Sequence, residues 1–199
     1  QRFYRTECPV KLMGMPVMYL PEMSDSSDGP FSTEVCLAAT IIHNLGYWKS
    51  FGDTASPLRL FRALKNFGMT DAEFFGYWQN DVPATTADAN ALISCWVKGS
   101  ALLVAVVNMA DTDRSISFGT AQDTVSGAVR YNGYGTSIAE GRSTPYTSVL
   151  TAGSNPNEYN ITVPRKNLTL LEFTIDEGGG GGGDSEIPVL AGSTYRRMR

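Results

Sequence analysis

The spacing of apolar residues changes between Asp81 and Asn90, and this change constrains the fold more than any other feature of the sequence. Before it, apolar residues recur every three or four positions, as in amphipathic helices, and these stretches alternate with short apolar runs. From Ala91 onward, apolar residues alternate with polar ones or form continuous runs of strand length. The intervening DVPATTADAN is rich in turn residues and has no helical period. We therefore expect an α+β protein in which a partial βα segment precedes an antiparallel β-sandwich.

Residues 1–83 are expected to contain three strands of a parallel sheet. The apolar runs that predict these strands lie at residues 13–20, 47–51 and 73–78. A predicted helix separates each strand from the next, which is the order of parallel βα units. A closed barrel of this kind needs about 250 residues, so this part of the chain can form only a TIM-barrel-like segment. The remaining part of the same precursor would have to complete such a barrel.

Two helices are expected between these strands. The first extends from about residue 33 to 45, and Gly46 would supply its left-handed stop. The second has Ser56 as its N-cap and Pro57 at its first position, and Gly68 ends it. The apolar face of this second helix is expected to consist of Leu58, Phe61, Leu64 and Phe67.

Residues 84–177 are expected to form the antiparallel β-sandwich. Short runs of strand length follow one another with turn residues at regular spacing, which is typical of sandwiches. The turn at residues 98–100 should join the first two strands as a hairpin. The predicted strands are residues 91–98, 101–108, 115–119, 124–132, 146–152, 158–164 and 167–176.

Six consecutive glycines at residues 178–183 begin a segment, 178–199, that we expect to be a Gly-rich linker and an Arg-rich tail. Glycines have no side chains to pack and lose much backbone entropy on ordering. An ordered tail would therefore need contact with a neighbouring copy or with the remaining part of the same precursor. The first residue is Gln and no signal-peptide pattern follows it, which indicates a piece of a longer precursor.

Charge and hydropathy exclude two classes of partner. The formal net charge is -4 and the isoelectric point is near 5.0, so the chain has no general basic surface for nucleic acid. No apolar run approaches the roughly 18 residues that a membrane span needs. Cys8, Cys36 and Cys95 show no metal-binding spacing, so we expect neither a metal site nor a cofactor, and one disulfide with one free thiol is conceivable.

Two sequons indicate the compartment. Asn160 and Asn167 each begin an N-x-T triplet in a region of expected strands, and only 18% of the residues are charged. Together these features favour an extracellular or secreted glycoprotein, with glycans on both asparagines.

Glu22 is the candidate catalytic residue. It follows the first predicted strand, and catalytic groups of βα proteins lie at the carboxyl ends of strands. A carboxylate there could serve glycoside hydrolysis as general acid or nucleophile. The competing interpretation is a solvated acidic loop, because Asp25 and Asp28 follow closely.

Aromatic and polar residues at two other strand ends are candidate sugar-binding groups. Tyr77, Trp78 and Asp81 follow the third predicted strand, and Trp48 lies in the second. Sugar rings stack on aromatic faces, and their hydroxyls need polar partners. The competing interpretation is that these aromatics belong to the core and that the polar run is a linker. For His43, the only histidine, we expect a structural or exposed position rather than base catalysis.

Four stretches resemble the carboxyl-terminal part of a family-123-like glycoside hydrolase. They are MPVMYLPEMSDSSDGPFSTEVCLAATIIHNLGYWKSFGD, LRLFRALKNFGMTDAEFFGYWQND, SCWVKGSALLVAVVNMADTDRSISF and NLTLLEFTID, within residues 10–176. The resemblance implies a TIM-like barrel that ends in a helix and a strand with a Tyr-Trp pair, followed directly by a sandwich. It implies a carbohydrate-processing ancestor, with Glu22, Tyr77 and Trp78 where a substrate cleft could be lined. The earlier barrel strands, which would be expected to carry most acid/base carboxylates, are not in this sequence.

Three functional hypotheses follow. The first is the terminal portion of a glycosidase-like protein that processes or binds carbohydrate and that is active only when the barrel is complete. The second is a non-catalytic structural glycoprotein subunit of an extracellular filament or surface assembly. The third is a carbohydrate-binding module, for which Trp96 is the sole aromatic candidate on the sandwich; we expect Trp96 to be in the core.

Overall fold

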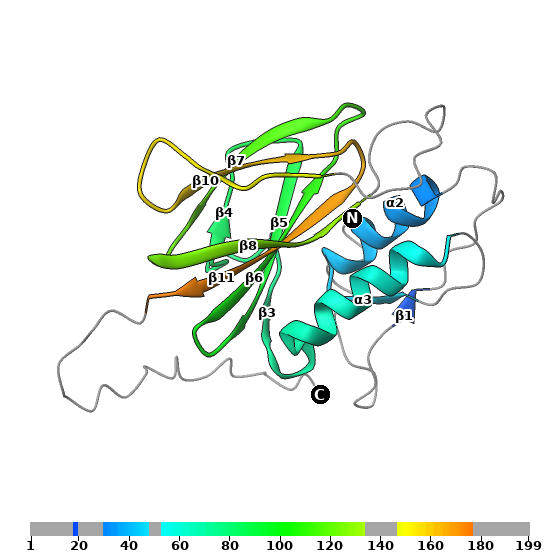
Figure 1. Ribbon diagram of the computed structural model, residues 1–199, viewed down its shortest axis with the longest axis horizontal. Coiled ribbons are helices and arrows are strands. Elements are labelled where there is room, and N and C mark those ends of the chain that lie inside the picture. The colour runs from blue at the N-terminus through cyan, green and yellow to red at the C-terminus, as the bar shows by residue number, and fades with distance from the viewer. Residues whose placement is uncertain (1–17, 20–29, 48–52, 134–146, 177–199) are drawn as a thin grey trace, which may run out of the picture.

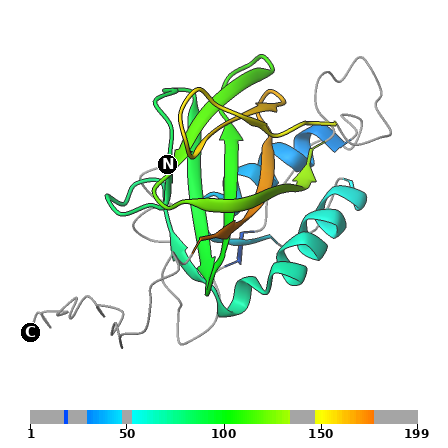
Figure 2. The ribbon, with the colours of Figure 1, turned by 60° about the vertical axis from the view of Figure 1, so that its left-hand side comes forward.

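The computed structural model describes residues 18–19, 30–47, 53–133 and 147–176. Two antiparallel sheets pack face to face as a sandwich. Two helices, α2 (Pro30–Ile41) and α3 (Ala55–Phe67), cover the outer face of one sheet (Figures 1 and 2). The described residues therefore form an α+β architecture with three layers, and the predicted β-sandwich is confirmed.

The sheet next to the helices has five strands in the order β3-β5-β6-β11-β8. The outer sheet has four strands in the order β4-β7-β10-β9, and neighbouring strands in both sheets are antiparallel. The five-stranded sheet consists of β3 (Glu73–Phe75), β5 (Ala91–Lys98), β6 (Ala101–Asn108), β8 (Thr124–Asn132) and β11 (Leu168–Ile175). The four-stranded sheet consists of β4 (Ala84–Thr85), β7 (Arg114–Thr120), β9 (Thr151–Ala152) and β10 (Glu158–Val163).

The predicted hairpin at residues 98–100 is confirmed. β5 pairs antiparallel with β6 along its whole length, from Ala91 opposite Asn108 to Lys98 opposite Ala101. The turn needs a positive φ, and Gly99 supplies it with φ 54°.

The continuous apolar run of β6 is explained by burial on both of its faces. Leu103, Ala105 and Val107 contact the cluster beneath the helices. Leu102 and the other residues of the alternate set face the core between the two sheets. A strand that is covered on both sides needs apolar residues at every position. The five-stranded sheet is thus the middle layer, with one core on each side of it.

β8 carries a bulge where it pairs with β11. Leu170 is opposite Tyr131, whereas the next residue, Leu171, is opposite Val129, so Arg130 is an extra residue in β8. Val129 packs into the core between the sheets, and Tyr131 packs into the core beneath the helices. Arg130 contacts Glu172. The bulge therefore accommodates a charged residue between the half-buried Val129 and the buried Tyr131.

The predicted helix ends are partly wrong. α2 ends at Ile41, not at residue 45, and Asn44 rather than Gly46 takes a left-handed conformation, with φ 57°. Gly46 instead belongs to β2 (Gly46–Tyr47). The stop at Gly68 is confirmed, because its φ is 80° and its N–H donates to the carbonyl oxygens of Leu64 and Lys65.

The apolar face of α3 is rotated from the predicted one. Leu58 and Phe61 are 52% and 38% exposed. The helix buries Leu60 and Leu64 against the sheet, together with Pro57 and Phe67 at its two ends. We predicted the face from large apolar residues that are three positions apart. The surface that contacts the sheet also includes the ring of Pro57.

The expected third parallel strand is wrong. β1 (Met18–Tyr19) does pair in parallel with β2, and α2 connects them. β3, however, pairs antiparallel with β5 of the sandwich. β3 therefore already belongs to the sandwich, although it was expected in the parallel sheet. The division of the chain into units of 1–83 and 84–177 stays a prediction. The expected strand residues 13–17 and 48–51, and the whole segment 178–199, lie outside the described residues.

A buried carboxyl group joins the helices to the sheet. Glu34 of α2 is 0% exposed. Its Oε1 accepts hydrogen bonds from Ser56 Oγ at 3.1 Å and from Tyr131 Oη at 3.3 Å. Its Oε2 accepts a hydrogen bond of 2.5 Å from Nδ2 of Asn167. Burying a carboxyl group is costly unless hydrogen bonds compensate it, so the Glu34 cluster specifies how α2, α3, β8 and the residue before β11 meet.

Replacing Glu34 by alanine should strongly destabilise the fold. The substitution leaves three buried donors without their acceptor and opens a void, so we expect the free energy of unfolding to fall by about 3 kcal/mol. Urea denaturation measures this change. Glu73→Ala is the matched control, because Glu73 is exposed on β3, and it should shift the midpoint little. A Glu34→Ala protein as stable as this control would contradict the role given to Glu34.

The start of α3 provides a pH-dependent prediction. Asp53 Oδ2 accepts a hydrogen bond of 2.7 Å from the N–H of Ser56. Burial by itself would raise the pKa of Asp53, but hydrogen bonds from Ser56, Ala55 and Thr54 lower it below its usual value. The charged form is therefore favoured in the folded state, so this stabilisation is present above the ordinary carboxyl pKa and is lost as the pH falls through the lower folded-state pKa.

Asp53→Ala should lower the free energy of unfolding by about 1 kcal/mol at neutral pH. The difference from the unsubstituted protein should shrink towards zero below the folded-state pKa. Denaturation curves over a series of pH values measure it. Thr54→Ala is the control, because the Thr54 side chain makes no capping hydrogen bond. A difference that is independent of pH would show that the carboxylate charge has no part in capping α3.

Candidate functional site

Tyr77 and Trp78 lie against His43 at the end of α2. His43 is 3% exposed, and its Nδ1 is 2.7 Å from the carbonyl oxygen of Ala39. Its Nε2 is 3.2 Å from the hydroxyl of Tyr77. Its ring stacks on Trp78, with centroids 5.8 Å apart and planes inclined by 22°. His43 is therefore a buried structural residue that links the helix layer to the turn after β3.

The same turn is fastened to the sheet by Ser94 of β5. The N–H of Tyr77 donates to Ser94 Oγ at 3.0 Å, and this hydroxyl donates to the carbonyl oxygen of Ile42 at 2.8 Å. Trp96 is 1% exposed, as predicted for a core residue, and donates from Nε1 to Asn44 Oδ1 at 3.2 Å. The end of α2 is thus bound by polar groups of β5 and of the turn.

Only part of the predicted sugar-binding set comes together. Tyr77 and Trp78 touch, with ring centroids 5.0 Å apart, and both are half-buried. Asp81 is exposed and makes no hydrogen bond or ion pair within the described part of the chain. Glu22 and Trp48 lie outside the described residues, so their places relative to Tyr77 stay a prediction.

The cavity next to Tyr77 is small. Its volume is about 140 Å³, below the roughly 300–1,000 Å³ of typical small-molecule sites. Alone it is too small for a saccharide chain. Its lining consists of Tyr77, Val82, Ala84, Thr85, Thr86, Ala91, Leu92 and Ile93.

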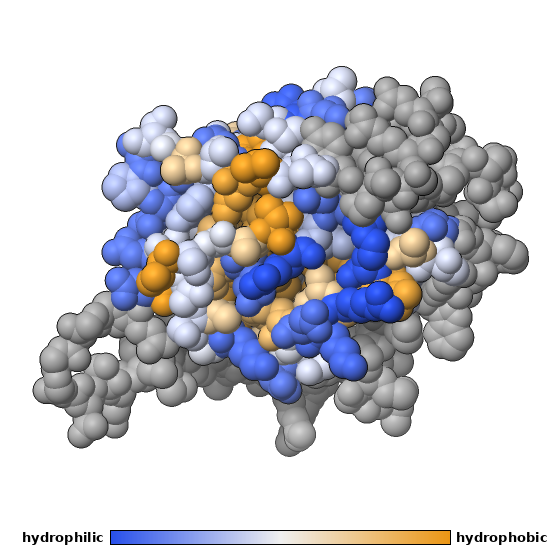
Figure 3. Space-filling view, viewed as in Figure 1, coloured by the Kyte–Doolittle hydropathy of each residue, from blue (hydrophilic) through white to orange (hydrophobic). Residues whose placement is uncertain are grey.

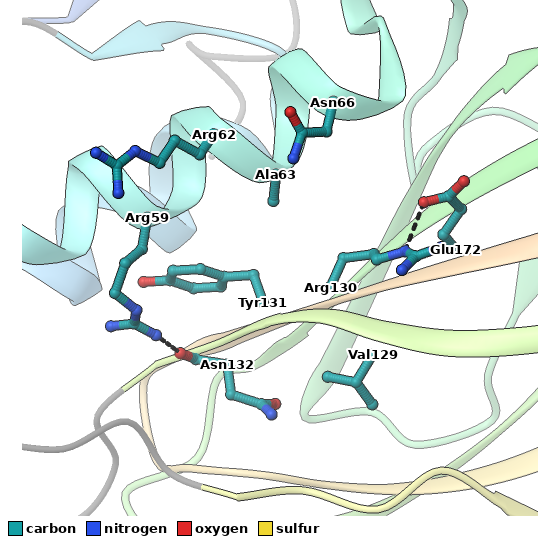
Figure 4. A pocket seen from close by; sticks show the side chains of 9 residues that line it. All are labelled: Arg59, Arg62, Ala63, Asn66, Val129, Arg130, Tyr131, Asn132 and Glu172. Atoms are coloured by element: carbon teal, nitrogen blue, oxygen red, sulfur yellow. Dashed lines mark hydrogen bonds and ion pairs between the residues drawn. The ribbon is translucent and has the colours of Figure 1, made fainter.

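A larger cavity lies where α3 faces β8, and we call it the α3–β8 groove. Its volume is about 680 Å³, which is in the range of small-molecule sites. Hydrophilic side chains gather on the surface where α3 meets β8 (Figure 3). Figure 4 shows the residues that line the groove: Arg59, Arg62, Ala63, Asn66, Val129, Arg130, Tyr131, Asn132 and Glu172.

Arg59 fixes one side of this groove. Its Nη2 donates to the carbonyl oxygen of Asn132 in β8 (Figure 4). Its guanidinium carbon lies 4.9 Å from the ring centroid of Tyr131, a cation–π arrangement. Arg59 therefore holds α3 and β8 together, in addition to contributing positive charge.

Two further arginines line the groove, one from α3 and one from β8. Arg62 lies one turn after Arg59 on α3 and is exposed. Arg130, the bulge residue of β8, forms an ion pair of 2.7 Å with Glu172 (Figure 4). The lining thus contains three guanidinium groups and one carboxylate, although the chain as a whole has a net charge of -4.

This arrangement is suited to binding an anion, not to acid–base catalysis. Guanidinium groups stay protonated and form strong, directional hydrogen bonds with carboxylates and sulfates. Glu172 is the one carboxyl group in the lining, and Arg130 pairs with it. Among the described residues, no group of three or more His, Cys, Asp or Glu side chains could hold a metal ion.

Sequence reasoning missed the groove. Arg59 and Arg62 are three apart on a predicted helix, which indicates a shared face. Nothing in the sequence, however, shows that this face lies opposite Arg130, some seventy positions later in the chain. A tertiary contact between the helix layer and β8 creates the site.

The described cysteines do not form a reactive site. Cys36 and Cys95 are both free thiols, and Cys8 lies outside the described residues. Burial raises the pKa of Cys95 to about 12 and also raises the pKa of Cys36. Both are therefore protonated at neutral pH and weakly nucleophilic.

The two sequons differ in exposure, and one prediction is wrong. Asn167 is 0% exposed, and its amide donates to Glu34. A glycan cannot be attached there in the folded state, so glycosylation of Asn167 is contradicted by its burial. Asn160 on β10 is half-buried, and its Nδ2 donates to the carbonyl oxygen of Ala152 at 3.3 Å near the sheet edge. Glycosylation of Asn160 stays a prediction.

Comparison with known proteins confirms the predicted resemblance. Residues 56–126, from α3 into β8, match the family model described as "Glycoside hydrolase 123, C-terminal domain". This match covers the second helix and the first part of the sandwich together. No curated protein matches the chain.

Two solved structures are similar to the chain. One is a GH30 endoxylanase from Clostridium papyrosolvens, with a TM-score of 0.50 and 10% identity, over 81% of this chain and 42% of that one. The other is a glycoside hydrolase family 30 subfamily 8 xylanase from Clostridium acetobutylicum, with a TM-score of 0.47 and 16% identity, over 81% and 43%. The chain therefore spans less than half the length of either structure. At 10% identity, the likeness to the first structure indicates a shared fold alone.

Expression in a host that attaches N-linked glycans should show which of the two sequons is glycosylated. We expect mass spectrometry of the folded, secreted protein to find glycan at Asn160 and none at Asn167. Asn160→Gln should then abolish the modification, whereas Asn167→Gln should leave it in place and lower stability by disturbing Glu34. A glycan on Asn167 in folded protein would contradict the packing described around Glu34.

Proposed function

We propose that the chain is the carboxyl-terminal part of a glycoside-hydrolase-like extracellular protein that processes carbohydrate. In this proposal the sandwich braces the last βα units of a barrel, and the remaining part of the same precursor completes that barrel. The observation that carries the proposal is the family match over residues 56–126, which includes both the helix packed on the sandwich and the sandwich strands up to the start of β8.

Two features of the helix layer support a completing polypeptide. β1 and β2 form a parallel pair of two strands, and within the described residues neither strand has another neighbour. Leu58 and Phe61 present apolar surface on the side of α3 that does not face the sheet. Neighbouring βα units of a barrel would cover both the open strand edges and these side chains.

The proposed catalytic residue is Glu22. It follows β1 by three positions, and β1 is one of the parallel strands at whose carboxyl ends such enzymes carry their reacting groups. Glycoside hydrolysis by this route needs a second carboxyl group across the scissile bond. The completed barrel would supply it.

Trp48, which follows β2 directly, would line the substrate cleft near these carboxyl ends. Tyr77 and Trp78 pack against His43, which precedes β2, so they lie towards the amino end of that strand and are left out of the proposed cleft. Asp81 stays a predicted sugar-binding residue.

The alternative is a non-catalytic structural glycoprotein subunit of an extracellular assembly. It was motivated by paired glycosylation sites and by the Gly-rich tail. The burial of Asn167 removes one of the two sites, and the tail lies outside the described residues. No contact among the described residues favours this alternative, so the enzymatic proposal is preferred.

Glu22→Gln should abolish hydrolysis. If Glu22 is the acid or nucleophile, the rate on polysaccharide or aryl glycoside substrates should fall by about 10³-fold, without loss of stability. The assay uses the protein as purified from its natural source or expressed at that full length. Glu73→Gln is the matched control and should retain full activity, because Glu73 is exposed on β3. Equal rates for the two variants would eliminate Glu22 as a catalytic residue.

Intact-mass analysis of the natural protein tests the completing polypeptide. We expect a mass well above the 21.6 kDa of this chain, or a companion chain that purifies with it. A lone chain of that mass, with no companion and no hydrolytic activity, would overturn the proposed function and leave the structural alternative.

A further inference from the structure

We propose that the α3–β8 groove binds an acidic saccharide, one that carries carboxylate or sulfate groups along its chain. The charge and geometry of the groove indicate that the ligand is an anion. That the ligand is a saccharide rests on the proposed function. The groove is distinct from the proposed catalytic cleft, because none of its lining residues belongs to the predicted cleft set.

The positive charge is held on both sides of the cavity. Arg62 comes from α3 and Arg130 from β8, so cations of two different elements line the groove. Their side chains extend in opposite directions, with Arg130 turned towards Glu172 (Figure 4). Arg130 occupies a bulge, and bulges re-aim single side chains and are frequent next to functional sites. Its ion pair with Glu172 leaves the guanidinium side chain half exposed, since 49% of its surface remains accessible. Glu172 therefore does not neutralise the positive charge of the groove.

Arg62 is the guanidinium best placed to bind a ligand. Its side chain is exposed, and within the described part of the chain no carboxylate pairs with it. Arg59 differs, because its contacts with Asn132 and Tyr131 already engage it structurally. A carboxylate or sulfate can take two parallel hydrogen bonds from one guanidinium group. Arg62 can thus supply specificity at no cost to the packing of α3.

The remaining lining favours a saccharide over other anions. Asn66 is exposed on the next turn of α3, and an amide can donate to and accept from sugar hydroxyls. Ala63 and Val129 are the only aliphatic residues in the lining, so there is no deep apolar pocket for the side chain of an acidic peptide. Nucleic acid would need a longer basic surface than one groove on a chain of net charge -4.

Calorimetric titration with matched oligosaccharides tests this proposal. The first probe is a tetramer of galacturonic acid, and its methyl ester is the control, because esterification removes the charge and keeps the sugar. A carrageenan tetrasaccharide, which carries sulfate groups and no carboxylates, distinguishes sulfate from carboxylate as the preferred group. We expect both acidic probes to bind with a Kd below about 1 mM and the methyl ester to bind at least 10-fold more weakly. Affinity should fall with rising salt.

Substitutions locate the binding in the groove. Arg62→Gln should weaken binding of the better acidic probe by about 10-fold, the loss expected for one charge-assisted contact. Arg130→Gln should also weaken it. Lys65→Gln is the matched control, because Lys65 is exposed on the same helix, carries the same charge and does not line the groove. It should change the Kd less than 2-fold. All three changes are on exposed side chains, and thermal unfolding confirms that each variant is folded.

The outcomes separate this inference from the proposed function. Equal binding of the acid and its methyl ester, no binding of any acidic probe, or equal Kd values for Arg62→Gln and Lys65→Gln would each overturn it. The Glu22→Gln assay would be unaffected by any of these results. Conversely, acidic saccharide binding that depends on Arg62, in a protein without hydrolytic activity, would support the groove and reject the enzymatic proposal.

Discussion

The buried carboxyl group of Glu34 is the constraint on which the arrangement of the helices depends. Apolar packing alone would hold α2 and α3 on the sheet, but it is non-directional and tolerates rotation and sliding. Hydrogen bonds from Ser56, Tyr131 and Asn167 to one buried carboxyl group are satisfied in one arrangement only. The same arrangement brings Arg59 over Tyr131 and so forms one wall of the α3–β8 groove. The polar cluster thus determines the shape of the site as well as the position of the helices.

The middle sheet has a second role, since it makes the helix layer and the sandwich a single structural unit. β6 contributes alternate residues to two cores. Neither the helix layer nor the outer sheet could be removed without exposing one face of a strand that is apolar on both. This shared layer gives a physical reason why one family match includes both α3 and the first strands of the sandwich.

Local signals in the sequence were sufficient for the longer sandwich strands and for part of the helices. They missed β4, and of the predicted strand at residues 146–152 only Thr151–Ala152 is a strand among the described residues. The run Ala101–Asn108 and the turn at Gly99 predict the central hairpin, because periodicity and turn chemistry act over a few residues. The third parallel strand was wrong, since the partner of Glu73–Phe75 is decided by β5, twenty residues away. The face of α3 was half right, because Leu64 and Phe67 are buried as predicted whereas Leu58 is apolar yet exposed. Of the predicted sugar-binding residues, Tyr77 and Trp78 are in contact. The burial of Asn167 could not be predicted, because its hydrogen-bond partner, Glu34, is far away in the sequence.

The bulge in β8 has a consequence for how such a groove could arise or be lost. Because Arg130 is the extra residue, the neighbours Val129 and Tyr131 would keep their present faces if that residue were deleted. A single codon gained or lost would therefore add or remove the groove's strand-borne cation without repacking either core. Related chains that differ in length by one residue at this position would share the fold of this protein and differ in the charge of the groove.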